Sequence, residues 1–297
     1  MTCGLCPRRC RIDRSVQSGY CTCGPLPRVA KIMRHYFEEP CISGSRGSGA
    51  IFFTGCNMNC VFCQNHELHD GFSGTAYTAG MLSDTMLSLQ DQGVHNINLV
   101  TPTPHAAVLA EAISAAKSNG LSVPVVYNTN SYSTPETIRS LAGLVDIYLA
   151  DLKYYSSVLS SRLSACGDYF DNAFACLREM YSQAGLLQIR DGLATKGLLI
   201  RHLILPGCVS DSRTLLQKIR DTFPPDITVS LMRQYTPNER VRSLPPFNRR
   251  LTDREYDSVL NFCLSIGLTN LYTQEAASAD PSYTPDFSAP LTDPENT

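Results

Sequence analysis

The stretch "AIFFTGCNMNCVFC", residues 50–63, joins a short apolar run to three cysteines at positions 56, 60 and 63. The run 50–55 has the length and composition of a buried parallel strand. The cysteines follow at once with the spacing C-x3-C-x2-C. Metal sites built from cysteine usually have four ligands, so a set of three leaves one coordination position without a protein ligand.

The pattern around this stretch alternates short apolar runs with helical segments. Further strands are expected at 96–102, 123–129, 145–153, 197–207 and 227–235, and helices at 80–92, 105–118, 134–142, 171–185, 211–221 and 252–265. Six such units predict an α/β fold, a closed or partly open (β/α) barrel, with a doubly wound open sheet as the alternative. Function then belongs at the carboxyl ends of the strands, where the cysteine triplet falls.

The composition narrows the class of protein. The 297 residues include 43% hydrophobic residues, enough for a large core, and 25 Lys and Arg against 27 Asp and Glu. This balance favours neither a nucleic-acid partner nor a membrane surface. No run is apolar enough to span a membrane, and residues 1–20 lack the apolar centre of a signal peptide, so we expect a cytoplasmic protein. Disulfides do not persist in the cytoplasm, and nine of the 13 cysteines fall within the first 63 residues, which indicates metal binding.

Three thiolates can hold three irons of a four-iron cluster and leave the fourth iron open. The amino and carboxylate groups of S-adenosylmethionine (SAM) can occupy that position. One electron from the reduced cluster then breaks the bond from sulfur to C5′, and the 5′-deoxyadenosyl radical takes hydrogen from a substrate. The motif for such a cluster is C-x3-C-x2-C with an aromatic residue directly before the last cysteine, and Phe62 is that aromatic residue. A zinc site completed by another cysteine, by His66 or by His69 is the alternative.

A second set, Cys3, Cys6, Cys10 and Cys21, has the spacing C-x2-C-x3-C-x10-C, with Cys23 two residues further on. Four thiolates can close a zinc site or hold a second iron–sulfur cluster, and the spacing does not separate these metals. The role is either structural, since this segment lacks hydrophobic periodicity, or that of an auxiliary cluster that relays electrons or anchors substrate. We therefore expect a cysteine-rich metal-binding segment at 1–45, a core at 46–273 and a tail with little structure at 274–297.

The chain resembles a known family over nearly its whole length. The resemblance rests on "CGLCPRRC…GYC", "EEPCISGSRGSGAIFFTGCNMNCVFCQNHE", "NLVTPTPH", "PVVYNTNSY", "VDIYLADLKYY", "GLLIRHLILPG" and "LMRQYTP". These motifs are similar to those of the radical SAM superfamily, and within it to the pyruvate formate-lyase activating-enzyme-like proteins with an amino-terminal cysteine cluster. The resemblance implies a partial (β/α)6 barrel, a [4Fe-4S] cluster, SAM, and an electron donor such as flavodoxin or ferredoxin.

The resemblance also implies cofactor contacts. Thr103 lies where activating enzymes carry a Gly-Gly-Glu turn that meets the amino group of SAM, and its hydroxyl is the candidate substitute. Asn128 replaces an acid that helps to hold a cation. Asp151 and Lys153 match an Asp-Leu-Lys motif, and the lysine is placed to reach the SAM carboxylate or a substrate anion. Tyr235 stands where a histidine lies near the adenosine.

Arg201 is a charge inside an apolar run, so it needs a carboxylate partner, either Asp151 or the cofactor. Lys153 and Arg201 are the candidate catalytic residues. His105 and His202 are expected to pack or cap rather than to catalyse.

Two functions from different classes remain open at this stage. The first is a radical SAM enzyme acting on an undetermined substrate, with activation of a glycyl-radical protein as one option. The second is a non-catalytic iron–sulfur or zinc protein that senses redox state or binds a partner. The altered cofactor turns at 102–104 and 128–130 are the only support for the second, and the intact triplet argues against it.

Overall fold

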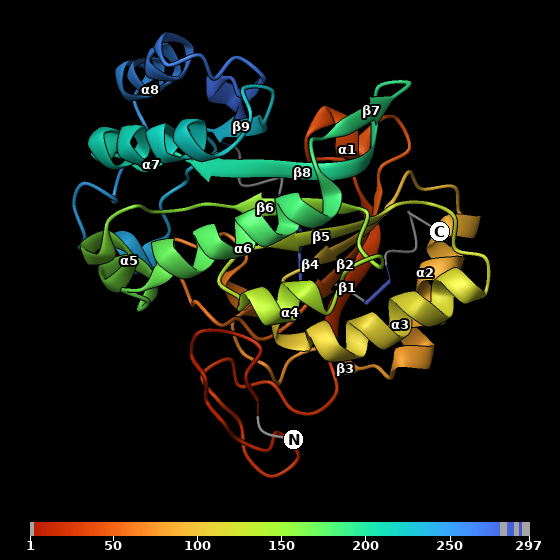
Figure 1. Ribbon diagram of the computed structural model, residues 1–297. Helices are drawn as coiled ribbons and strands as arrows, with labels where there is room; N and C mark the ends of the chain where they lie inside the picture. The colour runs from red at the N-terminus through yellow and green to blue at the C-terminus, as the bar shows by residue number, and fades with distance from the viewer. Residues whose placement is uncertain (1–2, 280–283, 288–290, 293–297) are drawn as a thin grey trace.

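The computed structural model describes residues 3–279, 284–287 and 291–292. Its centre is one twisted sheet in the order β10-β9-β8-β6-β5-β4-β2-β1-β3 (Figure 1). The parallel strands are β2 (Ser48–Phe53), β4 (Ile97–Val100), β5 (Val125–Thr129), β6 (Ile147–Asp151), β8 (Leu193–Leu203), β9 (Thr228–Met232) and β10 (Leu271–Thr273). Antiparallel partners are β1 (Arg28–His35), β3 (Thr75–Ala76) and the hairpin strand β7 (Gln188–Arg190).

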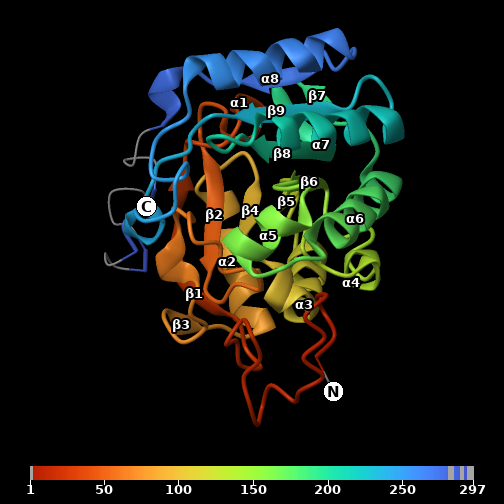
Figure 2. The same ribbon diagram turned by 90° about the vertical axis from the view of Figure 1, so that its left-hand side faces the viewer.

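Helices cover the outer face of the sheet, and Figure 2 shows them arranged around its curve. They are α2 (Ala79–Asp91), α3 (Ala106–Ser118), α4 (Pro135–Arg139), α5 (Ser157–Ser164), α6 (Tyr169–Ala184), α7 (Val209–Thr222) and α8 (Asp253–Ser265), with α1 (Pro40–Ser43) at the barrel end. Short 3-10 turns are η1 (His66–Leu68), η2 (Thr103–His105), η3 (Glu239–Val241) and η4 (Ala276–Ser278). Side-chain caps begin several helices: Thr252 and Glu255 form a reciprocal capping box at α8.

The predicted α/β fold class is confirmed, and the strand order decides between the two architectures. Strands β2, β4, β5, β6, β8 and β9 follow one another across the sheet in chain order. A doubly wound sheet would reverse its order at a switch point, whereas a barrel runs in one direction. The structure is therefore the partial barrel of six βα units, and each expected strand and helix overlaps an observed one.

The core has an outer and an inner part. Outside the sheet, one large cluster packs the helices against the strands, with side chains such as Leu82, Leu109 and Leu177 fully buried. Inside, Val126, Leu149 and Leu199 from three strands contact Cys41 and Ile42 of α1. The segment that follows β1 thus fills the interior of the barrel with apolar side chains.

Two segments differ from the sequence expectation. The stretch 1–45, which lacks periodicity, contains β1, and β1 pairs with β2 from Val29 to His35. The tail, expected to have little structure, makes defined contacts in its described parts: Ile32 N donates to Leu291 O at 2.8 Å, and Phe287 packs edge-on against Phe52. The other residues for which a tail with little structure was expected lie outside the described part of the chain. Short strands and edge contacts depend on distant partners, so local pattern does not reveal them.

The turn between β2 and the cysteine triplet requires a glycine. Gly55 has φ +84°, and a Cβ at this residue would lie 2.1 Å from the Cys23 sulfur and 2.8 Å from the Cys21 carbonyl oxygen. Residues 21–23 of the amino-terminal segment therefore lie directly against the start of the cysteine loop.

We expect Gly55→Ala to prevent this approach and to lower the free energy of unfolding by several kcal/mol, measured by urea denaturation. Gly93→Ala is the matched control, because Gly93 has the same φ of +84° but open space around its Cα. The control should lose only about 1 kcal/mol, the usual cost of a left-handed alanine. Equal losses in the two variants would show that the contact with Cys23 does not constrain the fold.

Candidate functional site

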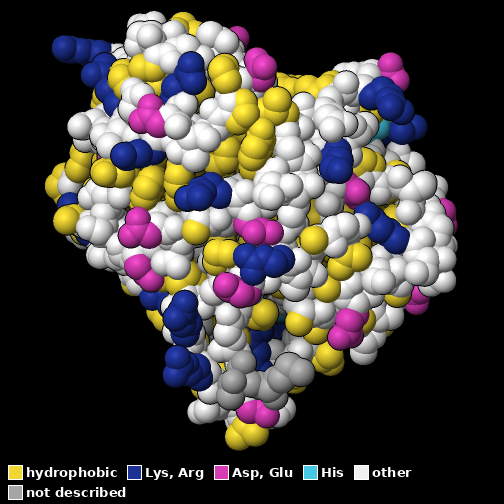
Figure 3. Space-filling model, viewed as in Figure 1, with side chains coloured by type: hydrophobic (Ala, Val, Ile, Leu, Met, Phe, Trp, Pro, Cys, Tyr) yellow, Lys and Arg dark blue, Asp and Glu magenta, His cyan; other side chains and the backbone are white. Residues whose placement is uncertain are grey.

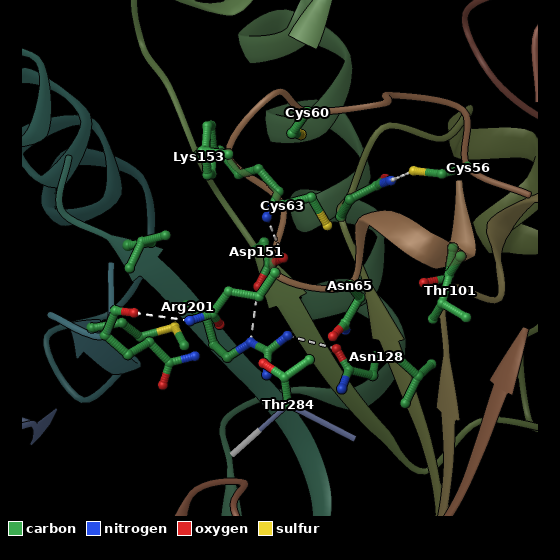
Figure 4. Close-up of a pocket in the computed structure, with 18 of the residues that line it drawn as sticks. Cys56, Cys60, Cys63, Asn65, Thr101, Asn128, Asp151, Lys153, Arg201 and Thr284 are labelled. Atoms are coloured by element: carbon green, nitrogen blue, oxygen red, sulfur yellow. Dashed lines mark hydrogen bonds and ion pairs between the residues drawn. The ribbon is translucent and has the colours of Figure 1, made fainter. Parts of the chain in front are cut away.

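A cavity of about 240 Å³ opens at the carboxyl ends of the parallel strands. Its walls include the three cysteines of the triplet and every residue predicted to bind the cofactor: Cys56, Cys60, Cys63, Phe62, Thr103, Asn128, Asp151, Lys153, Arg201 and Tyr235. Figure 4 shows the cysteines on one side of this space and Asp151, Arg201 and Asn128 on the other. The barrel therefore brings together side chains that are up to 180 positions apart in the chain, as parallel strands do.

Two of the triplet thiols accept hydrogen bonds from neighbouring residues. Cys60 Sγ accepts a hydrogen bond of 2.9 Å from the Ser164 hydroxyl, and Cys56 Sγ accepts one of 3.4 Å from the Met58 amide. Burial raises the pKa of the Cys60 and Cys63 thiols above their ordinary value. Buried thiols of this kind become thiolates when a metal binds them, because the metal supplies the missing charge.

The donor set of three thiols fits a four-iron cluster with one open iron. Within residues 3–279 and the described parts of the tail, no three His, Cys, Asp or Glu side chains gather closely enough to hold one metal ion. A four-iron cluster binds each thiolate at a different iron. The three free thiols that line one cavity supply one ligand for each of three irons.

A buried ion-pair network crosses the floor of the cavity. Arg201 Nε donates to Asp151 at 2.8 Å, Nη1 to Glu38 at 3.0 Å and Nη2 to the Asn128 amide oxygen at 2.6 Å. Glu38 also accepts from the Asn128 and Asn98 side chains, both at 2.9 Å. The side chains of Arg201 and Glu38 are only 11% exposed. Charges buried this deeply require such pairing, and Asp151 is the carboxylate partner anticipated for the arginine.

Lys153 lies between this network and the triplet. Its Nζ contacts an Asp151 oxygen at 2.6 Å. Burial alone would lower the pKa of Lys153, but the charge of Asp151 and a thiolate at Cys60 outweigh it and raise the pKa. Burial opposes ionisation of Asp151, yet Arg201 and Lys153 hold the pKa of that carboxyl below its ordinary value. Both groups are charged at neutral pH, and Lys153 offers a positive charge to an anion in the cavity.

Two other side chains predicted to contact the cofactor already make hydrogen bonds within the protein. Thr103 shares a hydrogen bond of 2.9 Å with Thr129. The Tyr235 hydroxyl donates to Phe247 O at 2.6 Å, and its ring lies 5.9 Å from the ring of Phe62. Phe62 and Tyr235 therefore give the cavity an aromatic wall, while the Tyr235 hydroxyl is already used.

The two histidines expected to pack do so. His105 Nε2 lies 2.9 Å from Thr54 O, and burial lowers its pKa to about 4. His202 contacts Leu152 O and the Ser212 hydroxyl and is likewise buried, with a lowered pKa. Neither histidine lines the cavity.

Sequence reasoning missed several lining residues. Glu38 lies in the segment set apart from the core, and its only local signal is the pair of acids before Pro40. The tail contributes Ser278, Thr284 and Pro285 to the cavity wall. These contacts join chain ends to the barrel, so no spacing in the sequence predicts them.

The amino-terminal cysteines also come together. Cys3, Cys6, Cys10 and Cys21 line a second, smaller cavity. Cys23 does not line it: its sulfur is buried 3.7 Å from Thr54 O and 3.9 Å from His105 Nε2. Cys23 thus lies outside the cavity that the predicted set of four lines, although its thiol donates to Cys21 O at 3.3 Å.

Comparison with known proteins agrees with this geometry. Residues 50–182 match the family model of the radical SAM superfamily. The matched residues, somewhat less than half of the chain, include the cysteine triplet and strands β4, β5 and β6. Enzymes of this superfamily use an iron–sulfur cluster to cleave SAM and produce a radical. The relatives named below are proteins other than pyruvate formate-lyase activating enzymes.

Two curated proteins are similar to this chain. It is 29% identical over 282 residues to an uncharacterised protein of Methanocaldococcus jannaschii, covering 91% of this chain and 76% of that protein. It is 24% identical over 192 residues to 7-carboxy-7-deazaguanine synthase of Methanothermobacter thermautotrophicus, covering 59% of this chain and 74% of the synthase.

Among solved structures, SuiB of Streptococcus suis bound to the precursor peptide SuiA superposes with a TM-score of 0.53 at 15% identity. The match covers 76% of this chain and 48% of SuiB, so this chain spans about half the length of that protein. At this identity the likeness shows the fold alone. No helix among the described residues is long and apolar enough to cross a membrane.

We expect Arg201→Met to lower the free energy of unfolding by about 3–5 kcal/mol, because it leaves the buried Glu38 and Asp151 carboxylates without their shared partner. Lys117→Met is the matched control, since its ion pair with Asp146 is about 30% exposed, and such pairs contribute about 1 kcal/mol or less. Urea denaturation of both variants measures the difference. A small loss at Arg201 would mean that the network does not hold the barrel interior.

Glu39, unlike Glu38, lacks a hydrogen-bond partner for one carboxylate oxygen among the described residues. It is fully buried, its Oε2 has no partner among the described residues, and burial raises the pKa of its carboxyl above the ordinary 4.5. Above pH 4.5 the unfolded state loses this proton, whereas the folded state keeps it up to its raised pKa. The stability that the protonated Glu39 contributes is therefore lost as the pH rises above 4.5. We expect Glu39→Gln to raise the midpoint of thermal unfolding at pH 8 but not at pH 5, whereas Glu38→Gln should lower it. No pH dependence of the Glu39→Gln effect would contradict this assignment.

Proposed function

We propose that this chain is a radical SAM enzyme whose catalytic [4Fe-4S] cluster is held by Cys56, Cys60 and Cys63. The observation that carries the proposal is that the three free thiols open onto the same cavity as the buried Arg201, Asp151 and Lys153. When bound, the cluster supplies one electron to the sulfonium of SAM, which gives the 5′-deoxyadenosyl radical.

The side chains around the cavity have distinct parts in this proposal. Lys153 pairs with the SAM carboxylate, since its ammonium lines the cavity and its charge acts on the Cys60 thiol. Thr103 offers a hydroxyl to the amino group. Asn128 also lines the cavity, with its amide held by Arg201 and Glu38. Phe62 and Tyr235 form an apolar wall against the adenosine and keep water away from the radical. Arg201 is a positioning residue, because its donors are used by Asp151, Glu38 and Asn128.

Two substrate classes have support. The motif resemblance to activating enzymes favours a glycyl-radical protein as the substrate. Against this, the cofactor turn at 102–104 lacks the acid that those enzymes carry. The similarity to 7-carboxy-7-deazaguanine synthase favours a small molecule instead. Deuterium carried from a labelled candidate into 5′-deoxyadenosine would identify the class. We propose a cytoplasmic setting, because all 13 cysteines are free thiols.

We expect the anaerobically reconstituted protein to form 5′-deoxyadenosine from SAM and dithionite, quantified by liquid chromatography. Cys60→Ala should lose this product, since the cluster loses one of its three ligands. Cys263→Ala is the matched control, because Cys263 is buried in α8 away from the cavity, and it should retain product formation.

SAM binding to the reconstituted protein, followed by calorimetry, completes the test. An intact, reduced cluster that neither binds nor cleaves SAM would refute the enzyme and favour a redox-sensing iron–sulfur protein.

A further inference from the structure

From Cys3 to Pro27 the described amino-terminal segment has no helix or strand, yet it is held to the barrel by hydrogen bonds. Arg8 donates to three barrel carbonyls, those of Asn57, Ser164 and Ala165, and its guanidinium lies 3.8 Å over the ring of Tyr20. On the α4 side, Leu5 O accepts hydrogen bonds from the Ser133 and Thr137 hydroxyls. These contacts fix the second cavity beside the cysteine loop. In Figures 1 and 2 the segment projects from one end of the barrel.

The two sets of cysteines are joined by one residue. Asn57, the neighbour of Cys56, lines the second cavity together with Cys6. Its Oδ1 accepts from Asn130 Nδ2 at 2.9 Å, and the same Nδ2 lies 3.8 Å from Cys56 Sγ. Asn57 therefore lies in the wall of the amino-terminal cavity and is connected to a thiol of the triplet, both along the chain and through Asn130. A purely structural metal would not require this adjacency.

The four thiols are not placed for a single ion. None of the triads formed by Cys3, Cys6, Cys10 and Cys21 is close enough to hold one metal ion in the described structure. The backbone nevertheless turns these residues toward one cavity: Arg9 N donates to Cys6 O at 3.0 Å, and Cys3 N donates to Ile12 O at 2.8 Å. Four thiolates around a shared space supply the ligands that a four-iron cluster requires, one for each iron.

The charge of the chain is divided unevenly. Residues 1–27, before β1, contain four Arg and one Asp, a charge of +3, which leaves −5 for the remaining residues of a chain with net charge −2. Arg9 and Arg11 are exposed, and Val16 of the same segment is 82% exposed. Figure 3 shows Lys and Arg side chains along one side of the projection at the bottom of the molecule. A basic surface with an exposed apolar residue is suited to brief contact with an acidic protein.

We propose that Cys3, Cys6, Cys10 and Cys21 hold a second [4Fe-4S] cluster that admits electrons to the catalytic one. The donor is an acidic one-electron carrier protein with a flavin or iron–sulfur centre, which docks on the basic surface around Arg9 and Arg11. This inference rests on the proposed function and names its partner.

The transfer balances without bond making or proton movement. The carrier is oxidised by one electron and the amino-terminal cluster is reduced by one. The same electron then passes along the Asn57 contact to the catalytic cluster, which returns the amino-terminal cluster to its starting state.

Metal content and spectroscopy test the site without relying on activity. Reconstituted wild type should contain about eight irons and no stoichiometric zinc, and Cys10→Ala about four. The reduced wild type should show two interacting paramagnetic centres by electron paramagnetic resonance, and the variant a single one. Zinc at the amino-terminal cysteines, or four irons in both proteins, would overturn the proposal.

The docking surface is tested with intact clusters. We expect Arg9→Glu/Arg11→Glu to keep its iron but to slow cluster reduction by reduced flavodoxin about tenfold at low salt, measured by stopped-flow bleaching, with the difference fading as salt rises. Arg190→Glu/Lys196→Glu is the matched control, because it makes the same charge change at exposed positions on the β7–β8 hairpin. Equal slowing in both double variants, or in neither, would overturn the docking site.

Dithionite separates this inference from the proposed function. Being small, dithionite reduces the catalytic cluster directly, so Cys10→Ala should still form 5′-deoxyadenosine with dithionite while losing most of the rate with flavodoxin. Product with dithionite and an unchanged rate with flavodoxin would refute the relay alone. Absence of product in wild type with dithionite would refute the proposed function instead.

Discussion

The Arg201 ion-pair network is the interaction on which the interior of this barrel depends. One guanidinium joins Asp151 on β6, Asn128 on β5 and Glu38 from the segment that follows β1. These groups would be costly to bury singly, and together they satisfy one another. The network therefore holds the residues after β1 inside the barrel, and it sets the floor above which the cavity opens.

The same network prepares the chemistry above it. Asp151 is shared between Arg201 and Lys153, so the lysine is held charged at the edge of the cysteine triplet. A fixed positive charge beside thiolates and an anionic ligand needs no rearrangement when the ligand arrives. The rings of Phe62 and Tyr235 form an apolar part of the cavity wall. Under the proposed function, the buried side chains that stabilise the barrel would also position the ligand.

The amino-terminal segment follows a different principle. Between Cys3 and Pro27 it has no helix or strand, and apart from its thiols it is held by arginine donors and carbonyl acceptors rather than by an apolar core. Cys23 lies directly against Gly55 at the start of the cysteine loop. The segment that carries the four cysteines therefore packs against the loop that carries the triplet.

The sequence by itself determined the order of the six βα units, the position of the triplet after a parallel strand, and the pairing of Arg201 with a carboxylate. Each of these follows from local rules: the period of apolar residues, the cysteine spacing, and the cost of burying a charge. Only the tertiary structure decided that β1 joins the sheet, that Glu38 enters the barrel, that tail residues such as Thr284 line the cavity, and that Asn57 lies between the two sets of cysteines. These contacts join segments far apart in the chain, and their formation depends on how the barrel closes, which no local pattern records.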